Sequence, residues 1–453
     1  MSTAAATVNS VQAYIDHVNP QWVRLLSLFQ MQTEYGLCSG AELHTTTGDV
    51  ILDFLSGYCV HNTGHNHPAI IAALHDELDR RGPVMLQSHV PDLAGELARR
   101  LCQLAGGNLE KAFFACSGSE GVEAAIKFAR ATTEREGILF CNSAFHGLTC
   151  GALSLMSDGF WRGNFGPMLG NTAGIAFGDM GALEEKLKTR DYAAFIVEPV
   201  QSEAGIVVPP QAYLRQAKEL CAKYGTLLVL DEVQTGMFRT GHFLAGHHFD
   251  VKPDMLILAK ALSGGLVPVS AVLMTNQIYS SVYNSLKRSI IHTSTFSENA
   301  LSMRAGLATL DVLAEEGLGP RAIALGGRLR SRLRQELTGY EMVGEIRGLG
   351  MLSGIVFRAP KSLRLRLSFE SFRRVHPAMF GQVMVMRMFR EQHVLTQMCG
   401  NNCMVLKVAP PLVITTEQID RFVSAICEVI HQAHHSNEFW AEALGLARRA
   451  LNV

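Results

Sequence analysis

The sequence predicts an α/β protein with a large domain built on a mainly parallel central sheet and a smaller α+β domain formed by both ends of the chain. The middle of the chain alternates short, β-branched apolar runs with helical patterns, and this alternation changes after about residue 320. At 453 residues, with 48% apolar and 18% charged side chains, the chain can bury two packed cores. We place residues 1–75 against the small domain, residues 76–320 in the large domain and residues 321–453 in the small domain.

The expected elements of the large domain follow from these patterns. Short apolar runs predict buried strands at residues 112–116, 138–141, 193–198, 226–231, 255–258 and 269–274. Apolar residues at helical spacing predict helices at residues 120–131, 211–224 and 299–316.

The two ends of the chain carry a different pattern. A helix is expected at residues 321–337, with strands at 342–347 and 351–357. The first sixty residues have a turn-rich strand pattern, and we expect them to pack with the C-terminal domain because chain termini often lie close together. Residues 369–388 are rich in Phe, Met and Val; they form either ordinary core, which we favour, or the lining of a substrate access groove.

Charge and hydropathy exclude several classes of partner. Forty basic and 41 acidic side chains give a net charge of −1, and the sequence pI is near 7.0, so nothing indicates a nucleic-acid or acidic-membrane partner. The mean hydropathy is +0.14, but no apolar run reaches the roughly 18 residues that a membrane span requires. The N-terminus lacks the pattern of a secretory signal and the ten cysteines have no paired spacing, so we expect a cytoplasmic protein.

Two clusters of potential metal ligands favour structural interpretations. The pair Cys399-Gly-Asn-Asn-Cys403 has no second pair to complete a zinc site. The histidines of His61-Asn-Thr-Gly-His-Asn-His67 lie beside Gly64 and Pro68, which predict a turn or loop instead of a helix that would align ligands. We therefore expect no metal site in this chain.

Three segments bring reactive groups to expected strand ends. Cys116-Ser-Gly-Ser-Glu120 opens a helix, where free backbone N–H groups and the helix dipole suit a phosphate, although the same residues suit a plain helix cap. Asp231 ends one apolar strand, where it either contacts a ligand or caps a helix. Lys260 ends another, where it is either solvated or partly buried with a lowered pKa and able to form a Schiff base.

The combination of these groups is more specific than each of them. Asp231 and Lys260 are 260 − 231 = 29 residues apart, about one strand–connection–strand unit, so we expect them at neighbouring strand ends. A phosphate cradle, a carboxylate and a lysine are the groups that pyridoxal phosphate requires.

The sequence resembles the class III aminotransferases of the fold-type I pyridoxal-phosphate family, such as ornithine, acetylornithine and 4-aminobutyrate aminotransferases. The matching segments follow the family order over nearly the whole chain. They are Asp53-Phe-Leu-Ser-Gly-Tyr58, Gly64-His-Asn-His-Pro68, Ser117-Gly-Ser-Glu-Gly-Val-Glu-Ala-Ala-Ile-Lys127, Phe145-His-Gly147, Glu198-Pro-Val-Gln-Ser-Glu-Ala-Gly205, Asp231-Glu-Val-Gln-Thr-Gly236, Ala259-Lys-Ala-Leu-Ser-Gly-Gly265, His292-Thr-Ser-Thr-Phe296 and Ala409-Pro-Pro-Leu412. Each segment is modest evidence by itself, and together they are specific.

The resemblance implies roles for individual residues at the cofactor. Lys260 is implied to be the Schiff-base lysine and the base that moves the substrate proton, and Asp231 to hold the pyridine nitrogen protonated. Gln234 is implied to hydrogen-bond the ring hydroxyl oxygen, with Val233 beneath the ring and Phe145 stacked on its other face. The remaining implied contacts are Gly118 and Ser119 at the phosphate, His146 and Glu198 close to the cofactor, and, in a homodimer, Ser294 and Thr295 from the partner subunit at the same phosphate.

Two positions depart from the family pattern and bear on the substrate. Ornithine-type members have an arginine where this chain has Leu148, and many members have an arginine where it has Lys407. Lysine cannot form the planar two-bond fork that arginine makes with a carboxylate. Tyr58 and Glu203 complete the expected substrate residues, with a solvated rim carboxylate as the alternative for Glu203.

These residues predict an aminotransferase acting on small molecules. It is expected to move an amino group between an amino acid of the glutamate or alanine class and an aldehyde or ketone with an apolar or weakly charged chain. Two alternatives on the same scaffold are an ornithine- or acetylornithine-type aminotransferase, and an amino-acid decarboxylase, racemase or epimerase. A non-enzymatic cofactor-binding regulator is disfavoured because Lys260 and Asp231 are retained.

Overall fold

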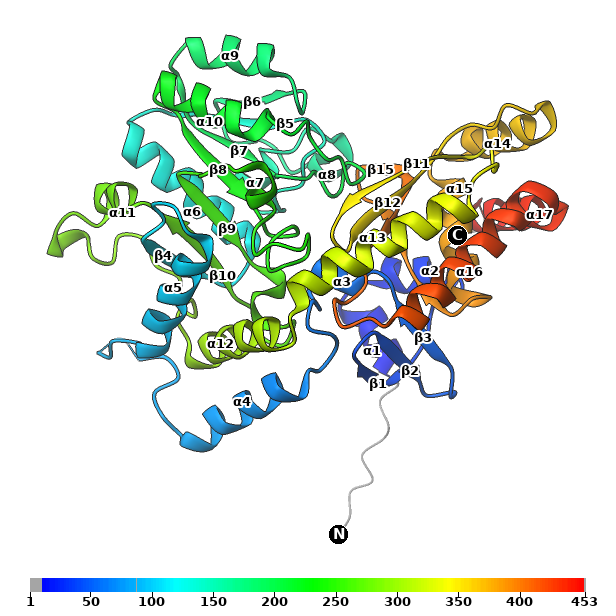
Figure 1. Cartoon of the computed structure of the whole chain (residues 1–453), viewed down its shortest axis with the longest axis horizontal. Coiled ribbons are helices and arrows are strands. Elements are labelled where there is room, and N and C mark those ends of the chain that lie inside the picture. The colour runs from blue at the N-terminus through cyan, green and yellow to red at the C-terminus, as the bar shows by residue number, and fades with distance from the viewer. Residues whose placement is uncertain (1–9, 87, 452–453) are drawn as a thin grey trace.

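The computed structural model describes residues 10–86 and 88–451. A seven-stranded sheet with strand order β4-β10-β9-β8-β7-β5-β6 forms the centre of the larger part of the molecule (Figure 1). Its strands are β4 (Lys111–Ala115), β5 (Gly137–Cys141), β6 (Thr172–Ile175), β7 (Tyr192–Val197), β8 (Leu227–Asp231), β9 (Met255–Leu258) and β10 (Ser270–Met274). The neighbours from β9 through β6 pair in parallel, and β10 runs antiparallel to both β4 and β9.

The predicted strands of the large domain all form, with ends within one residue of the predicted ones, and β6 is added at the sheet edge. The five residues of β5 and of β10 and the four of β9 are all buried, as their uninterrupted apolar runs require of strands covered on both faces.

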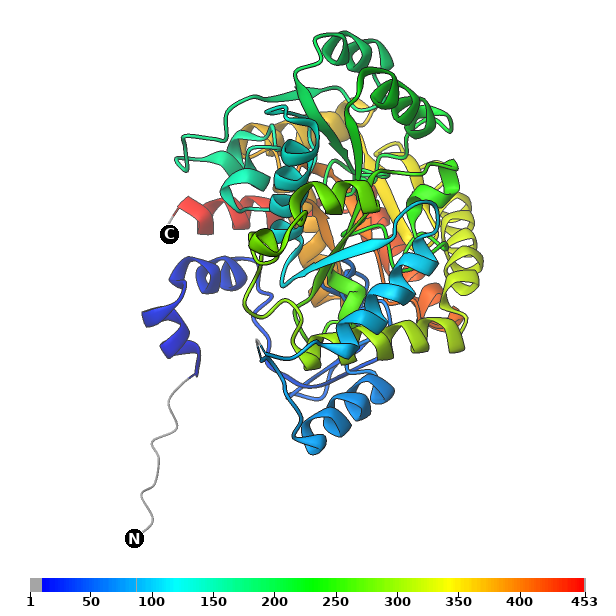
Figure 2. The same cartoon turned by 90° about the vertical axis from the view of Figure 1, so that its left-hand side faces the viewer.

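Helices cover the two faces of this sheet (Figures 1 and 2). The three predicted helices form as α6 (Gly118–Thr133), α10 (Tyr213–Tyr224) and α12 (Ala300–Glu315). In α6, Val122, Ala125, Ile126 and Ala129 are buried, as their helical spacing predicts. Further helices in this part are α4 (Pro68–Arg80), α5 (Asp92–Ala105), α7 (Cys150–Leu153), α8 (Gly159–Arg162), α9 (Met180–Lys188) and α11 (Asn276–Val282).

The C-terminal part is built on a four-stranded antiparallel sheet with order β11-β12-β15-β14. Its strands are β11 (Val343–Leu349), β12 (Leu352–Phe357), β14 (Gln397–Cys399) and β15 (Asn402–Val408), and its helices are α13 (Leu318–Glu336), α14 (Leu363–Val375), α15 (Met379–Arg390), α16 (Thr416–His435) and α17 (Asn437–Leu451). Phe369 and Met384 are fully buried in α14 and α15. Together with Phe372 and Phe380 they belong to the main hydrophobic core, which supports the favoured interpretation of the segment 369–388 as core.

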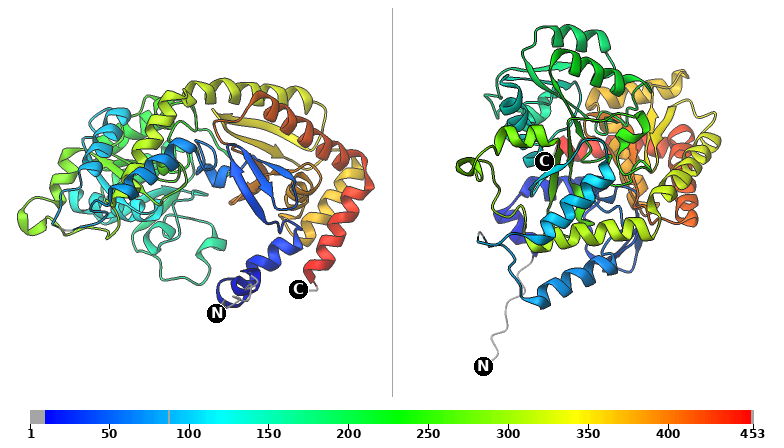
Figure 3. Two further views of the ribbon diagram at one scale, coloured as in Figure 1. Left: turned by 90° about the horizontal axis from the view of Figure 1, so that it is seen from below. Right: turned by 60° about the vertical axis from the view of Figure 1, so that its left-hand side comes forward.

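The N-terminal segment packs with the C-terminal part, as the sequence predicts. Strands β1 (Tyr35–Ser39), β2 (Glu42–Thr45) and β3 (Val50–Asp53) form a sheet whose fourth strand is β13 (Val394–Leu395), parallel to β3. The helices α1 (Ser10–His17) and α2 (Pro20–Leu28) lie on the same side of the molecule as α17, which contacts α2 (Figure 3). The division of the chain at residues 75 and 320 stays a prediction.

Residues 10–86 and 88–451 contain neither a membrane-spanning helix nor a metal-binding cluster. No helix in those ranges combines the length and apolarity needed to cross a bilayer. No group of three or more His, Cys, Asp or Glu side chains in the same ranges is arranged to hold a metal ion. The loop at residues 61–67 precedes α4, and within it His65 Nε2 lies 2.7 Å from Asp53 Oδ2.

Candidate active site

A cavity of about 410 Å³ lies at the carboxyl ends of β8 and β9, where ligands bind in open α/β sheets. The first turn of α6 and the loop after β5 complete its walls. The predicted site residues that line it are Gly118, Ser119, Phe145, His146, Glu198, Asp231, Val233, Gln234 and Lys260. Segments that are far apart in the sequence are thus brought to one place by the strand order of the sheet.

Lys260 begins a 3-10 turn, Lys260–Ser263, directly after β9. Its backbone φ is +50°, in the left-handed region that non-glycine residues adopt only at a cost. Burial lowers the pKa of its ammonium, although the nearby charge of Asp231 acts in the opposite direction. A lysine with a lowered pKa is more readily deprotonated, so it is suited to act as a nucleophile and as a proton carrier.

Asp231 and His146 form a buried pair beside the cavity. His146 Nδ1 lies 2.8 Å from Asp231 Oδ2, and Asp231 Oδ1 accepts a hydrogen bond from the backbone N–H of Val233 at 3.1 Å. Burial opposes a charged imidazolium, but the hydrogen bond and the charges of Asp231 and Glu198 outweigh it, so the pKa of His146 is raised. His146 Nε2 is buried and has no hydrogen-bond partner among the described residues.

Glu198 holds the loop that carries Phe145. Its carboxylate accepts hydrogen bonds from the backbone N–H of Phe145 at 3.1 Å and of Ser202 at 3.1 Å. Burial raises the pKa of Glu198 to about 7, with the charge of His146 acting against burial. Glu198 therefore fixes the backbone next to the cavity, as a buried carboxyl group with satisfied acceptors.

The N-terminus of α6 faces the cavity through Gly118 and Ser119. The first N–H groups of a helix have no acceptor within the helix and lie at the positive end of its dipole, so this turn suits a phosphate. The loop after β5 approaches the same turn at Gly147, whose φ is +124° and where a Cβ would lie 2.1 Å from Ser119 Oγ. Only glycine allows that approach.

Phe145 and Val233 contribute apolar contacts to the cavity. The two Val233 methyl groups pack against Gly118, where a Cβ would lie 3.1 Å from each of them. The Phe145 ring packs edge-on against Trp161, with 5.3 Å between ring centroids. The predicted contacts of these two side chains with opposite faces of the cofactor ring stay predictions.

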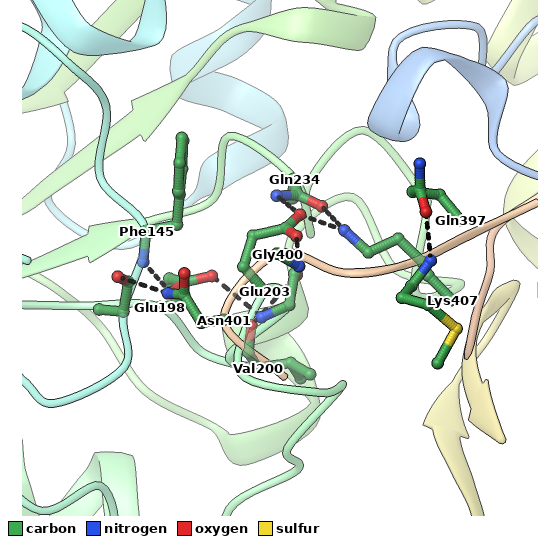
Figure 4. Close-up of polar contacts among 12 residues, drawn as sticks. Phe145, Glu198, Val200, Glu203, Gln234, Gln397, Gly400, Asn401 and Lys407 are labelled. Atoms are coloured by element: carbon green, nitrogen blue, oxygen red, sulfur yellow. Dashed lines mark hydrogen bonds and ion pairs between the residues drawn. The ribbon is translucent and has the colours of Figure 1, made fainter. Parts of the chain in front are cut away.

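A second polar cluster joins the loop after β7, the loop after β8 and β15 (Figure 4). Lys407 Nζ donates to Glu203 Oε1 and, at 3.3 Å, to Gln234 Oε1, while Gln234 Nε2 donates to Glu203 Oε1 at 3.0 Å. The backbone N–H of Gly400 donates to Glu203 Oε2 at 2.7 Å. Glu203 is only 6% exposed, so the alternative of a solvated rim carboxylate is wrong.

The electrostatics of this cluster favour an ionised pair. Burial disfavours both charges, but the attraction between them is stronger. The pKa of Glu203 is therefore lowered and the pKa of Lys407 is raised. Lys407 enters the site as a buried ammonium that is already paired.

Tyr58 reaches this cluster from a strained turn. Residues Ser56–Cys59, α3, have φ values between +46° and +69°, a left-handed turn that costs about 1–2 kcal/mol at each position other than Gly57. Asp53 Oδ1 accepts the backbone N–H of Ser56 at 2.7 Å and stabilises the turn. The Tyr58 ring centroid consequently lies 5.2 Å from Lys407 Nζ, where a ring and a cation attract each other.

Six predicted site residues are not among the described residues that line this cavity: Tyr58, Glu203 and Lys407, which form the adjoining cluster around Gln234, and Leu148, Ser294 and Thr295. Leu148 is 53% exposed, and its backbone N–H donates to Ser119 Oγ at 3.3 Å. Ser294 Oγ donates to Glu120 Oε1 at 3.3 Å and, together with Thr295, lines a separate cavity. The predicted role of Ser294 and Thr295 at a partner's phosphate stays a prediction.

The sequence did not indicate Trp161 or Asn401 as residues near the site. Trp161 Nε1–H donates to Asn401 Oδ1 at 2.7 Å, a contact across 240 residues of sequence. The signal available was weak: two adjacent aromatic residues, Phe160 and Trp161, between glycines in an irregular stretch.

These features fit pyridoxal phosphate. One cavity holds a lysine with a lowered pKa, a carboxylate fixed by two hydrogen bonds and a glycine-containing helix N-terminus, which match the carbonyl, the pyridine nitrogen and the phosphate of that cofactor. The fold and the site together define an α/β enzyme of the pyridoxal-phosphate type.

The chain belongs to the class-III aminotransferase family, which it matches over residues 30–430. It is 34% identical to aminotransferase PigE of a Serratia species, covering 94% of this chain and 53% of PigE, so it spans about half the length of that relative. It is 35% identical to putrescine aminotransferase of Pectobacterium atrosepticum, covering 94% of this chain and 89% of the relative. An ornithine aminotransferase structure from Toxoplasma gondii is 30% identical, covers 96% of this chain and 100% of its own, and superposes with a TM-score of 0.81.

Family membership confirms the predicted α/β architecture of fold type I, the aminotransferase activity and the pyridoxal-phosphate cofactor. The comparisons give no support to the decarboxylase, racemase or epimerase alternative.

Proposed function

We propose that this aminotransferase moves an amino group between an amino acid of the glutamate or alanine class and an aldehyde or ketone whose chain is apolar or weakly charged. The observation that carries the proposal is the absence of an unpaired cationic clamp: no arginine is among the described residues that line the cavity, and Lys407 is already paired with Glu203. Apart from Lys260, which we assign to the cofactor, a chain without charge therefore meets no unpaired cation among the described lining residues. The apolar residues along one side of the cavity are Leu266, Val267, Pro268 and Val269.

We assign the chemistry at the cofactor to Lys260 and Asp231, as the resemblance implies. Pyridoxal phosphate, when bound, supplies an electron sink for the pair of electrons left when the substrate carbon loses its proton. Lys260 Nζ carries that proton, because its lowered pKa allows it to be both base and acid. The Asp231 carboxylate, held by His146 and by the Val233 N–H, would keep a proton on the pyridine nitrogen of the bound cofactor.

We propose that the Glu203–Lys407 pair serves the two half-reactions in different ways. While an apolar amine occupies the pocket, Glu203 neutralises Lys407. When the amino acid or its keto acid occupies the pocket, Lys407 pairs with the substrate carboxylate, and Gln234 and the Gly400 N–H continue to satisfy Glu203. The contacts that support this proposal are those that Glu203 keeps without Lys407.

We also propose that the functional unit is a homodimer. A cavity lined by Ser294 and Thr295 also contains Val84, Leu86 and Ile290. These three apolar side chains are exposed in the single chain, which supports a surface covered by a second copy. Light scattering at assay concentration is expected to give twice the chain mass, and an active monomer would refute the proposal.

We propose a cytoplasmic location as well. All ten cysteines are free in the structure, which supports a reducing compartment.

A panel of amines tests the proposed function. Straight-chain primary amines from propyl to octyl are compared with putrescine, ornithine and 4-aminobutyrate, each with pyruvate or 2-oxoglutarate as the acceptor. We expect kcat/KM to rise with the length of the apolar chain and turnover to require the keto acid. A clear preference for ornithine would contradict the proposal and would mean that another residue supplies the carboxylate clamp.

A further inference from the structure

Trp161 occupies a position next to the cavity that the roles above do not use. It lies on α8, is half-buried, and packs edge-on against Phe145 with 5.3 Å between ring centroids. Its indole N–H donates to Asn401 Oδ1 at 2.7 Å. An aromatic ring held at both its edge and its N–H has a defined orientation, so it can act as a fixed wall.

Asn401 anchors this wall to the rest of the site. Besides accepting from Trp161, its side chain donates to the backbone oxygens of Ser143 at 2.9 Å and Ala144 at 3.2 Å, just before Phe145. Its backbone N–H donates to the backbone oxygen of Glu203 at 2.9 Å. Figure 4 shows Asn401 between the Phe145 segment and Glu203. One residue thus fixes the relative positions of Phe145, Trp161 and Glu203.

The indole extends from Phe145 to the Glu203–Lys407 pair. Gly400 lies between the two side chains: a Cβ atom added to this glycine would lie 3.4 Å from Trp161 Cζ2 and 3.1 Å from Glu203 Oε2. The benzene edge of Trp161 therefore comes close to the residue whose N–H binds the Glu203 carboxylate. Trp161 lies between the ring that lines the cavity and the cluster that we assign to the carboxylate of the amino acid.

We infer that Trp161 is a specificity-determining residue whose indole forms the apolar wall along which a straight aliphatic amine or aldehyde chain lies. This inference rests on the proposed function. The reacting carbon has to reach Lys260 in the cavity that Phe145 also lines, so a chain that leaves the cavity past Phe145 runs beside the Trp161 ring that packs against Phe145. Each methylene buried against such a wall raises kcat/KM by roughly fourfold at most.

The test measures how kcat/KM depends on chain length in three proteins. Propyl- to octylamine are used with pyruvate, in the wild type, in Trp161→Ala and in Trp161→Phe. We expect the rise with chain length to flatten in Trp161→Ala, with at least about a tenfold loss for octylamine and less than about a twofold change in kcat for propylamine. Trp161→Phe retains an apolar ring but loses the bond to Asn401, so it is expected to keep part of the rise.

Two controls separate specificity from damage to the fold. Phe165→Ala removes a 71% exposed aromatic ring from the segment directly after α8 and is expected to keep the full dependence on chain length. Straight-chain alcohols are used as unreactive competitors, and their inhibition constants are expected to lose the same dependence in Trp161→Ala as kcat/KM does. A purely structural role would instead lower kcat for all amines equally and leave the dependence intact.

The outcomes distinguish this inference from the proposed function. If the wild type shows no rise with chain length, the proposed function is wrong and the inference falls with it. If the wild type shows the rise and both Trp161 variants keep it, the inference alone is overturned. If Trp161→Ala does not fold, the test depends on Trp161→Phe. The inference is overturned if kcat/KM in Trp161→Phe rises with chain length as in the wild type and the inhibition constants of the alcohols are unchanged. A smaller rise of kcat/KM with chain length supports the inference.

Discussion

The two ends of the active site are built in different ways. At the cofactor end, Asp231 and Lys260 follow neighbouring parallel strands and Gly118 opens α6, so each group is positioned by the element that carries it. At the substrate end, Glu203 and Lys407 are 204 residues apart and are positioned by each other. The difference shows that the sheet itself positions the groups at the cofactor end, whereas contacts between distant segments position the groups that we propose to select the substrate.

The largest effect is expected at the cofactor end, from Lys260→Ala. We expect turnover to fall by about 10⁴-fold or more, because the variant lacks both the amine that binds the cofactor and the group that moves the proton. Lys252→Ala, an exposed lysine near β9, is the matched control and should retain activity. Borohydride reduction of the wild type is expected to fix the cofactor to the peptide that contains Lys260, and fixation to a different lysine would refute the assignment.

The next largest effect is expected from Asp231→Ala. We expect kcat to fall by about 100- to 1,000-fold in both half-reactions, since a charge aimed at the reacting system is lost. The fold should persist, because the variant is not left with an unpaired buried charge. Asp231 raises the pKa of His146, and without Asp231 the buried imidazole can lose its proton and become neutral. Rapid-mixing kinetics and thermal unfolding measure the two results, and near-normal turnover would contradict the role of Asp231.

The sequence predicted the cofactor end better than the substrate end for a physical reason. Asp231 and Lys260 each follow an apolar run that forms a strand, so local pattern and spacing were enough to place them together. The burial of Glu203 depends on Lys407 and on the N–H of Gly400, which lie about two hundred residues away and have no local signal. The Trp161–Asn401 contact was not predicted for the same reason.

The same contrast, between features with a local sequence pattern and features that depend on distant segments, applies to the fold. Six of the seven strands of the large sheet were predicted to within one residue because they are continuous apolar runs, whereas the four-residue edge strand β6 was not predicted. The two-residue strand β13 pairs with β3 across more than three hundred residues, and such a short strand has no periodicity to detect.

A smaller effect is expected when an arginine is returned to the substrate end. In Leu148→Arg we expect the ratio of kcat/KM for ornithine to that for hexylamine to rise by about tenfold, because one charged hydrogen bond to a carboxylate is worth about 1.5–3 kcal/mol. Leu286→Arg introduces the same charge at a 95% exposed position and should leave the ratio unchanged. An equal ratio in both variants would show that residue 148 does not reach the substrate.

The smallest effect on turnover is expected from Glu198→Gln, within about threefold, because Glu198 contacts the backbone of the site. Burial raises the pKa of Glu198 from 4.5 to about 7, so the folded state keeps a proton that the unfolded chain releases between those pH values. Wild-type stability therefore falls as the pH rises through that range, and glutamine removes this loss. Urea unfolding gives the free energy of unfolding of the variant minus that of the wild type. We expect this difference to be about 1–3 kcal/mol more favourable to the variant at pH 8 than at pH 5. An equal difference at the two pH values would contradict the account.

The difference between the two ends is tested most directly by measuring the two half-reactions separately in single turnovers. The double variant Glu203→Gln and Lys407→Gln removes both buried charges together, so that neither is left without a partner. The account predicts that the half-reaction with an alkyl amine stays within about threefold of wild type, while the half-reaction with glutamate or alanine slows by about tenfold or more, since a charged hydrogen bond to the carboxylate is lost. Equal losses in both half-reactions would contradict it.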